Sequence, residues 1–135
     1  MQKAEVDRWL EAYVSAWRSY DPDEIEALFA ANVTYRYHPY DDPIEGRDAV
    51  VADWLGEDDS PDGSSRDRPG TYDASYRAVA VDGAVAVATG STRYREERGG
   101  PITRTFDNCF VIRFDEDGRC VDFVEWFMER PTTSR

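Results

Sequence analysis

The sequence predicts an α+β domain in which three helices are followed by an antiparallel sheet. The early part of the chain carries apolar residues at helical spacing, whereas the later part alternates with period two between turn signals. A length of 135 residues suits one domain, so we expect a single domain over residues 1–135. Hydrophobic residues make up 41% of the chain, which is enough to bury a core and excludes a disordered chain.

Two helices are expected before residue 33. The first covers residues 3–20, because apolar residues recur there at spacings of three and four. These residues are Val6, Trp9, Leu10, Tyr13, Val14 and Trp17. Asp21 can cap the second helix, Pro22 suits its first turn, and Glu24 occupies the capping-box position. We expect this second helix to end near Asn32.

A strand, a short helix and a loop follow. β-branched and aromatic residues predict a strand over residues 33–38, which Pro39 and Pro43 end. A third helix is expected over residues 47–55. Residues 56–70 have the composition of a polar loop.

Four longer strands complete the predicted sheet, over residues 72–81, 84–95, 102–115 and 120–129. Asp82-Gly83 separates the first two of these strands and predicts a two-residue hairpin turn.

The net charge of −12 bears on the partners of the protein. Such a surface repels phosphate backbones and anionic lipid, so we expect neither nucleic acid nor a membrane as a partner. The chain has no apolar run of membrane-spanning length and begins without a secretory segment, so we expect a cytoplasmic protein. A single histidine and two cysteines argue against a metal site. The sequence contains no phosphate-binding glycine motif, and we expect no cofactor.

Acidic residues are concentrated between Asp41 and Asp73, where eleven of them accompany three arginines. We interpret this stretch as a solvated face and loop, and a cation site is the alternative.

The last hairpin places polar residues among phenylalanines. If Glu116 and Asp117 form its tip, Asn108 faces Glu125 directly. The neighbouring pairs are then Phe106 with Phe127, Phe110 with Phe123, and Ile112 with Val121. Burial on this apolar face would raise the pKa of Glu125, which makes it a candidate general acid or base that Asn108 orients.

Two alternatives remain for this hairpin. A three-residue tip with Gly118 in the left-handed conformation would shift the pairing by one residue and leave Glu125 opposite Cys109. The Asn108–Glu125 pair can also be purely structural, or the carboxylate can reach solvent at the sheet edge.

Other candidate site residues lie earlier in the chain. His38 is the one side chain that ordinarily titrates near neutrality. Alternation places it on the face opposite Tyr35 and Tyr37, which points away from the pocket, so a hydrogen-bonded structural histidine is the alternative. Three aromatic residues can line a cavity between the helices and the sheet, or simply pack in the core: Tyr13, Trp17 and Trp54.

Five short stretches resemble the nuclear-transport-factor-2-like superfamily, and its SnoaL-like branch in particular. They are residues 13–17 (YVSAW), 21–29 (DPDEIEALF), 32–35 (NVTY), 43–50 (PIEGRDAV) and 114–121 (FDEDGRCV). The resemblance implies a cone in which helices close a strongly curved, mostly antiparallel sheet around an apolar pocket. It also implies a homodimer formed through the outer sheet face, for which we expect Cys109, Val111, Val124 and Trp126.

The resemblance also bears on individual positions. Tyr13 matches the helix tyrosine of the ketosteroid isomerases, but Tyr37 and Phe110 stand where those enzymes carry acids. Glu125 matches the last-strand carboxylate of the SnoaL-like cyclases. Glu125, Asn108 and Arg104 resemble part of the catalytic residue set of the epoxide hydrolases of this fold. The second inward acid of that set has no evident counterpart in this sequence.

The sequence therefore predicts a cofactor-independent acid/base enzyme of the isomerase, cyclase or hydratase/lyase type, acting on a small apolar organic molecule. The expected catalytic residues are Glu125, Asn108 and His38. The expected substrate-binding residues are Tyr13, Trp17, Tyr37, Trp54, Phe106, Phe110, Phe123 and Phe127, with Tyr13 and Tyr37 as hydrogen-bond donors to a substrate oxygen. The alternative is a ligand-binding or dimerisation module without chemistry.

Overall fold

A computed structural model describes residues 1–57 and 66–131 of the chain. Its helices are α1 (Lys3–Ser19), α2 (Pro22–Leu28) and α3 (Arg47–Trp54). Its strands are β1 (Phe29–Arg36), β2 (Ile44–Glu45), β3 (Tyr72–Asp82), β4 (Val85–Arg95), β5 (Ile102–Phe114) and β6 (Cys120–Glu129). The predicted α+β class, with three helices on a mostly antiparallel sheet, is confirmed.

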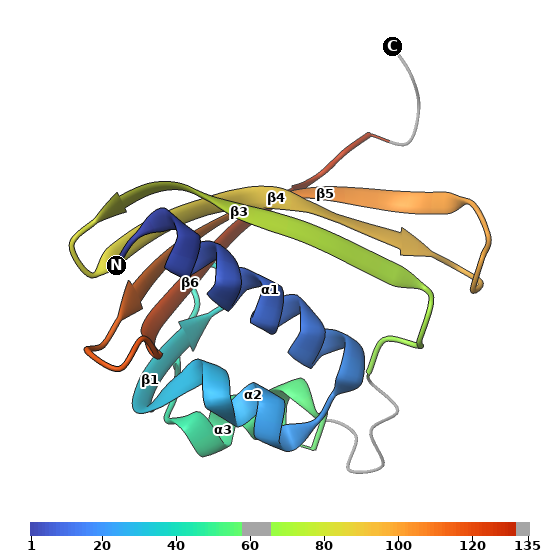
Figure 1. Cartoon of the computed structure of the whole chain (residues 1–135). Helices are drawn as coiled ribbons and strands as arrows, with labels where there is room; N and C mark the ends of the chain where they lie inside the picture. Colours follow the sequence, from blue (N-terminus) through green and yellow to red (C-terminus); the bar gives the residue numbers. More distant parts are fainter. Residues whose placement is uncertain (58–65, 132–135) are drawn as a thin grey trace.

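The six strands form one curved sheet in the order β2-β1-β6-β5-β4-β3. All neighbours are antiparallel except β1 and β6, which run parallel. α1 lies across the concave face near β3, whereas α2 and α3 cover the end of the sheet formed by β1 (Figure 1). Side chains of the helices and of the concave face therefore point towards each other in the space between the two layers.

The second helix begins as expected but ends earlier. Asp21 caps it by accepting a hydrogen bond from the backbone N–H of Asp23 at 2.9 Å, and Pro22 is its first residue. Glu24 accepts from the Ser19 hydroxyl at 2.6 Å rather than closing a capping box. The helix stops at Leu28, not near Asn32, because the following residues pair with β6 as a strand.

The strand after this helix is consequently longer than expected at its start. It begins at Phe29, which is fully buried and pairs with Cys120. The pairing slips between Phe29 and Thr34, so the added residues form an irregular entry into the sheet.

The hydrophobic core lies between α1 and the sheet, beside the cavity described below. Trp9 and Tyr13 of α1 pack against fully buried aromatic rings of the strands, and the Tyr35 and Phe123 rings stack with their centroids 4.5 Å apart. The Trp9 indole N–H donates to the Leu28 carbonyl at 3.0 Å, which ties α1 to the end of α2.

The β3–β4 hairpin turns one residue later than expected. Asp82 pairs with Val85, so Gly83 and Ala84 are the two turn residues rather than Asp82 and Gly83. Gly83 has φ +59°, a conformation that glycine adopts without the steric cost of a side chain.

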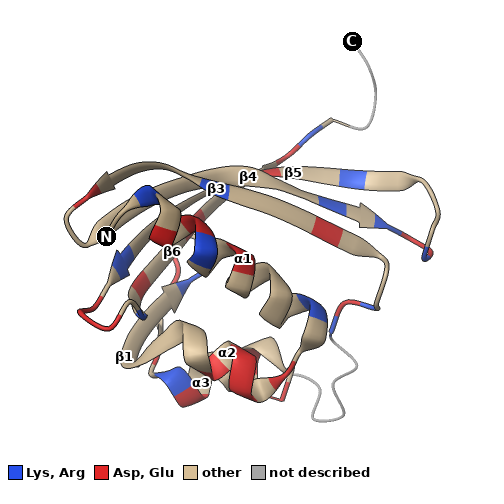
Figure 2. Ribbon diagram, in the orientation of Figure 1, with Lys and Arg blue, Asp and Glu red and all other residues tan. Residues whose placement is uncertain are grey.

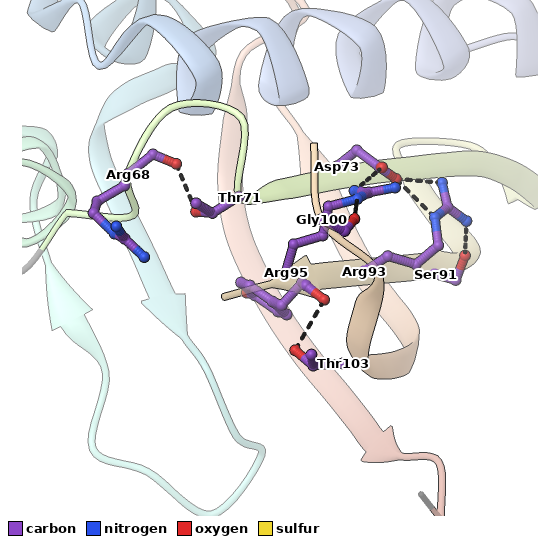
Figure 3. A network of polar contacts seen from close by, with 9 residues as sticks. Arg68, Thr71, Asp73, Ser91, Arg93, Arg95, Gly100 and Thr103 are labelled. Atoms are coloured by element: carbon purple, nitrogen blue, oxygen red, sulfur yellow. Dashed lines mark hydrogen bonds and ion pairs between the residues drawn. The ribbon is translucent and has the colours of Figure 1, made fainter. Parts of the chain in front are cut away.

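An ion-pair network holds the outer side of β3 and β4 together. The Asp73 carboxylate accepts hydrogen bonds from Arg93 at 2.7 Å and from Arg95 at 3.0 Å (Figure 3). Arg95 also donates to the Gly100 carbonyl at 3.0 Å, so the network reaches the loop that leads into β5. It lowers the pKa of Asp73, because both guanidinium groups favour the charged carboxylate over the desolvation that opposes it.

The β5–β6 pairing differs from the expected one. Asn108 pairs with Phe127 and Phe110 pairs with Glu125, which is a displacement by two residues from the alignment that sets Asn108 directly opposite Glu125. The expected pairs Phe106–Phe127, Phe110–Phe123 and Ile112–Val121 are therefore wrong. A displacement by two preserves the side-chain face, so Asn108 and Glu125 still share the concave side as diagonal neighbours.

Two irregularities of one residue each produce this displacement. The first is a three-residue tip with Gly118 at φ +79°, as in the alternative expected from the sequence. The second is an extra residue in β6, Val121, because the pairing jumps from Cys120 to Asp122. Their sum restores the inward direction of Glu125.

Charged residues lie mainly on the helices, the turns and the strand ends (Figure 2). The first turn of α2 carries Asp23 and Glu24, and the β5–β6 tip is acidic. In the described part of the chain, no helix combines the length and apolar character of a membrane span.

Candidate functional site

A cavity of about 360 Å³ lies between the helices and the concave face of the sheet. Most of its walls are aromatic side chains, contributed by Tyr13, Trp17, Tyr20, Tyr35, Tyr37, Trp54, Tyr76, Tyr94, Phe106 and Phe127. The other lining residues are Asp53, Asp67, Thr92, Asn108 and Glu125. The site thus combines a mainly aromatic enclosure with three carboxyl groups.

Glu125 is held in this cavity by a chain of hydrogen bonds. Asn108 Nδ2 donates to Glu125 Oε2 at 2.7 Å, and Asn108 Oδ1 accepts from the Thr92 hydroxyl at 2.9 Å. The Thr92 hydroxyl has one proton and gives it to Asn108, so at 2.6 Å it accepts from the Tyr76 hydroxyl. The chain fixes the orientation of the Asn108 amide and, through it, of the carboxylate.

Burial dominates the electrostatics of Glu125. Its side chain is 9% exposed, and desolvation raises its pKa from 4.5 to about 7, although the Asn108 hydrogen bond and the charge of His38 lower it. Glu125 Oε1 makes no hydrogen bond to any residue in the described part of the chain. This oxygen is therefore available to a bound molecule, and the group exchanges protons near neutral pH.

The tyrosines of the cavity stay protonated. The Tyr13 and Tyr35 hydroxyl groups lie 2.9 Å apart, and burial raises the pKa of both well above the ordinary value. One hydrogen bond between two hydroxyl groups uses one proton, which leaves the other proton free to donate. The Tyr37 hydroxyl instead donates to Asp53 at 2.6 Å, so its proton is already committed.

Two further acids of the cavity were not expected from the sequence. Asp67 accepts from the Trp17 indole at 3.1 Å and lies 3.5 Å from the Tyr20 hydroxyl, and burial raises its pKa. Asp53 lies on α3, three residues after the fully buried Val50, and this helical spacing was the available signal. Asp67 follows a stretch without periodicity, so no pattern indicated its direction. Both acids come from the run that we interpreted as a solvated face.

The expected site residues divide into those that line the cavity and those that do not. Phe110 and Phe123 lie behind the wall, at 1% and 0% exposure. His38 is outside the lining: its Nδ1 lies 2.9 Å from Asp41 Oδ2, and its ring stacks on Tyr40. The remaining expected residues all line the cavity: Tyr13, Trp17, Tyr37, Trp54, Phe106, Asn108, Glu125 and Phe127.

Arg104 does not take the place of a catalytic arginine. It forms two hydrogen bonds to the Glu129 carboxylate, at 3.0 and 2.8 Å, on the exposed end of the sheet. It lines an adjoining hollow together with Arg95 and not the cavity itself. Within residues 1–57 and 66–131, no group of three histidine, cysteine or acidic side chains can hold a metal ion.

The fold and this cavity define the chain as a cone-shaped pocket protein of the nuclear-transport-factor-2-like superfamily. The chain belongs to the SnoaL-like domain family, whose sequence profile matches residues 10–123. The expected family is confirmed. A search of curated protein sequences found no match.

Solved structures of low sequence identity share the fold. An LEH-like epoxide hydrolase from M. tuberculosis is 18% identical with a TM-score of 0.62, over 93% of this chain and 84% of that one. A protein from Kribbella flavida described as a ketosteroid isomerase is 14% identical with a TM-score of 0.65, over 98% and 84%. Bal32a, from a soil-derived mobile gene cassette, is 19% identical with a TM-score of 0.63, over 93% and 90%.

Proposed function

We propose that the protein is a cofactor-independent acid/base enzyme of the isomerase, cyclase or hydratase/lyase type, acting on a small organic molecule in the cavity. The observation that carries this proposal is Glu125, a buried carboxyl group with one oxygen fixed by Asn108 and the other without a hydrogen-bond donor among the described residues. A pKa of about 7 suits a group that must both take and return a proton at neutral pH.

In this proposal Glu125 is the proton carrier. Its carboxylate removes a proton from a substrate carbon beside a carbonyl, and the electron pair of that C–H bond moves towards the carbonyl oxygen. The free proton of the Tyr13–Tyr35 pair donates to this oxygen as its negative charge develops. Protonated Glu125 then returns its proton to another substrate atom, which leaves the enzyme unchanged.

The other expected residues take supporting roles. Asn108 orients the carboxylate, and His38 acts on Glu125 only through its charge. Tyr37 is not a donor to the substrate in this scheme, because its proton goes to Asp53.

The test is the titration of the Glu125 carboxyl carbon by NMR, with Glu125→Gln to assign the signal. We expect a pKa near 7. Glu116→Gln, which changes an exposed glutamate at the tip of the same hairpin, should leave that signal in place. A Glu125 pKa at the ordinary value would rule out the acid/base role and favour the ligand-binding module.

We also propose that two copies associate through the outer sheet face. Cys109, Val111 and Val124 are half-buried there, and Trp126, opposite Cys109, is 43% exposed. An apolar strip of this kind on a protein of charge −12 is a natural site for a second copy. A cytoplasmic location and the absence of nucleic-acid and membrane partners remain predictions from the sequence.

A further inference from the structure

The charged residues that line the cavity are all acidic. Glu125, Asp53 and Asp67 contribute to the walls, and no lysine, arginine or histidine does so among the described residues. The chain contains 15 arginines, so basic side chains are not scarce. In the described part of the chain, six of them form ion pairs away from the cavity, as Arg93 does with Asp73.

Two of the cavity acids are held by neutral donors alone. Glu125 receives the amide of Asn108, and Asp67 receives the Trp17 indole. Neither acid forms an ion pair with a residue in the described part of the chain. Buried carboxylates are ordinarily compensated by a cation, because a bare charge in a poorly hydrated site is costly. A proton neutralises such a group, and so does a positive charge supplied by a bound molecule.

The nearest basic groups do not fill this gap. His38 acts on Glu125 from outside the lining, while it contacts Asp41. Arg66 is outside the lining: its guanidinium carbon lies 5.4 Å from the centre of the Tyr20 ring, and its Nε donates to the Leu55 carbonyl. In the adjoining hollow, the two arginines are already ion-paired: Arg95 with Asp73, and Arg104 with Glu129.

The aromatic walls favour the same kind of ligand. The face of an aromatic ring attracts a cation through its quadrupole, most strongly for tryptophan, and two tryptophans, Trp17 and Trp54, line the cavity. Tyr20 and Tyr94 line it beside Asp67 and keep their protons, since burial raises the pKa of both. Aromatic side chains combined with carboxylates form a lining that suits an ammonium group better than a neutral hydrocarbon.

We propose that the molecule taken up by this cavity carries a positive charge, as a small amine or quaternary ammonium compound. This inference deepens the proposed function and rests on it in one respect, because it takes the cavity of Glu125 as the substrate site. It replaces the small apolar molecule expected from the sequence with a cationic one. The overall charge of −12 also attracts such a molecule towards the protein.

Proton release should accompany the binding. Without a bound cation, burial raises the pKa of Glu125 to about 7, so this group is partly protonated at neutral pH. A bound cation favours the charged carboxylate and expels this proton. The other titratable groups around Glu125 are His38 and the tyrosines Tyr13, Tyr35, Tyr37, Tyr76 and Tyr94, all five of which stay neutral in this range.

The experiment compares two probes of the same shape, choline and its carbon analogue 3,3-dimethylbutan-1-ol, which lacks the charge. Binding to the full chain is measured by NMR chemical-shift titration at pH 8 and pH 5.5. We expect choline to bind at least about fivefold more tightly than the alcohol at pH 8. The preference should shrink at pH 5.5, where Glu125 is protonated. Calorimetry in buffers of different ionisation enthalpy should detect the released protons at pH 7.

Glu125→Gln should weaken choline binding and leave the alcohol unchanged, whereas Glu116→Gln should change neither. If Glu125→Gln does not fold, Asp67→Asn provides the same comparison. Equal affinities for the two probes, or no choline binding at about 50 mM, would overturn the proposal. If one of these two results is found while Glu125 titrates with a pKa near 7, the cationic ligand is refuted and the proposed acid/base role is not. A preference for choline with an ordinary Glu125 pKa would refute that role and keep the cationic ligand.

Discussion

At the scale of single residues, the proposed function depends on a carboxyl group that is costly to keep in the cavity. The folded protein holds a proton on Glu125 up to a pH of about 7, whereas the unfolded chain releases it near 4.5. Because the folded state binds more protons between these values, its stability falls as the pH rises through this window. Above the window, the buried carboxylate lowers the free energy of unfolding by about 3 kcal/mol.

Glu125→Gln should therefore stabilise the protein at high pH while removing the proposed proton carrier. Glutamine keeps an oxygen for the Asn108 donor and has no charge to desolvate. Chemical denaturation should show a variant more stable by up to about 3 kcal/mol at pH 8 and little changed at pH 4.5. The difference from the wild type isolates this group from other titrations. Equal stability of the two proteins at both pH values would contradict a buried Glu125.

Thr92 determines which way the Asn108 amide points. Thr92→Val preserves the side-chain shape but leaves Asn108 Oδ1 and the Tyr76 hydroxyl without their partner. We expect a loss of about 1–3 kcal/mol in the free energy of unfolding. The Glu125 pKa should rise further, because the Asn108 hydrogen bond that lowers it is weakened. Denaturant unfolding and the carboxyl titration measure the two effects.

The matched control for Thr92 is Thr89→Val on the same strand. Thr89 points to the outer face, opposite Cys109, and has no part in the chain of hydrogen bonds. A Glu125 pKa that moves equally in both variants would show that the effect does not pass through Asn108.

At the scale of elements, the sheet leaves no room for a side chain on β4 at Gly90. Gly90 pairs with Tyr76, and a Cβ at this position would meet the Ser75 carbonyl oxygen and lie 2.6 Å from the Tyr76 ring. Gly90→Ala should therefore displace β3 and cost about 1–3 kcal/mol of stability. It should also break the bond between Tyr76 and Thr92, which NMR of the Tyr76 ring would detect. Thr89→Ala, at the neighbouring outward position, should leave both unchanged.

The period-two pattern predicted the shared face of Asn108 and Glu125 but not their partners. The face is correct because the three-residue tip and the extra residue Val121, both absent from the expected alignment, cancel in side-chain direction. Their alignment was missed because Val121 adds a residue that no composition or turn signal reveals. The early end of α2 has a similar origin: the pairing of Phe29 with β6 outweighs local helix preference.

At the scale of the whole molecule, the cavity is built from segments that are far apart in the sequence. Its walls combine side chains from α1, α3 and five of the strands, and Asp67 comes from the segment before β3. The sequence predicted six of the ten aromatic side chains found in the described lining, because residues on regular elements have a direction that periodicity reveals. The four that were not expected are Tyr20, Tyr35, Tyr76 and Tyr94. The sequence missed the acidic character of the cavity, since the direction of an aspartate outside such elements depends on the completed fold.

The curved sheet also separates the cavity from the proposed dimer surface. Glu125 and Trp126 are adjacent in β6, so one points into the concave side and the other to the outer face. Trp126→Arg should place a charge in the apolar strip and convert a dimer into monomers, as measured by analytical ultracentrifugation. The pKa of Glu125 should stay near 7 in this variant, because the sheet lies between the two side chains. Val79→Arg is the control, since it adds the same charge at another exposed apolar position, on β3. Monomers in the wild type, or an unchanged dimer in Trp126→Arg, would exclude this face as the interface.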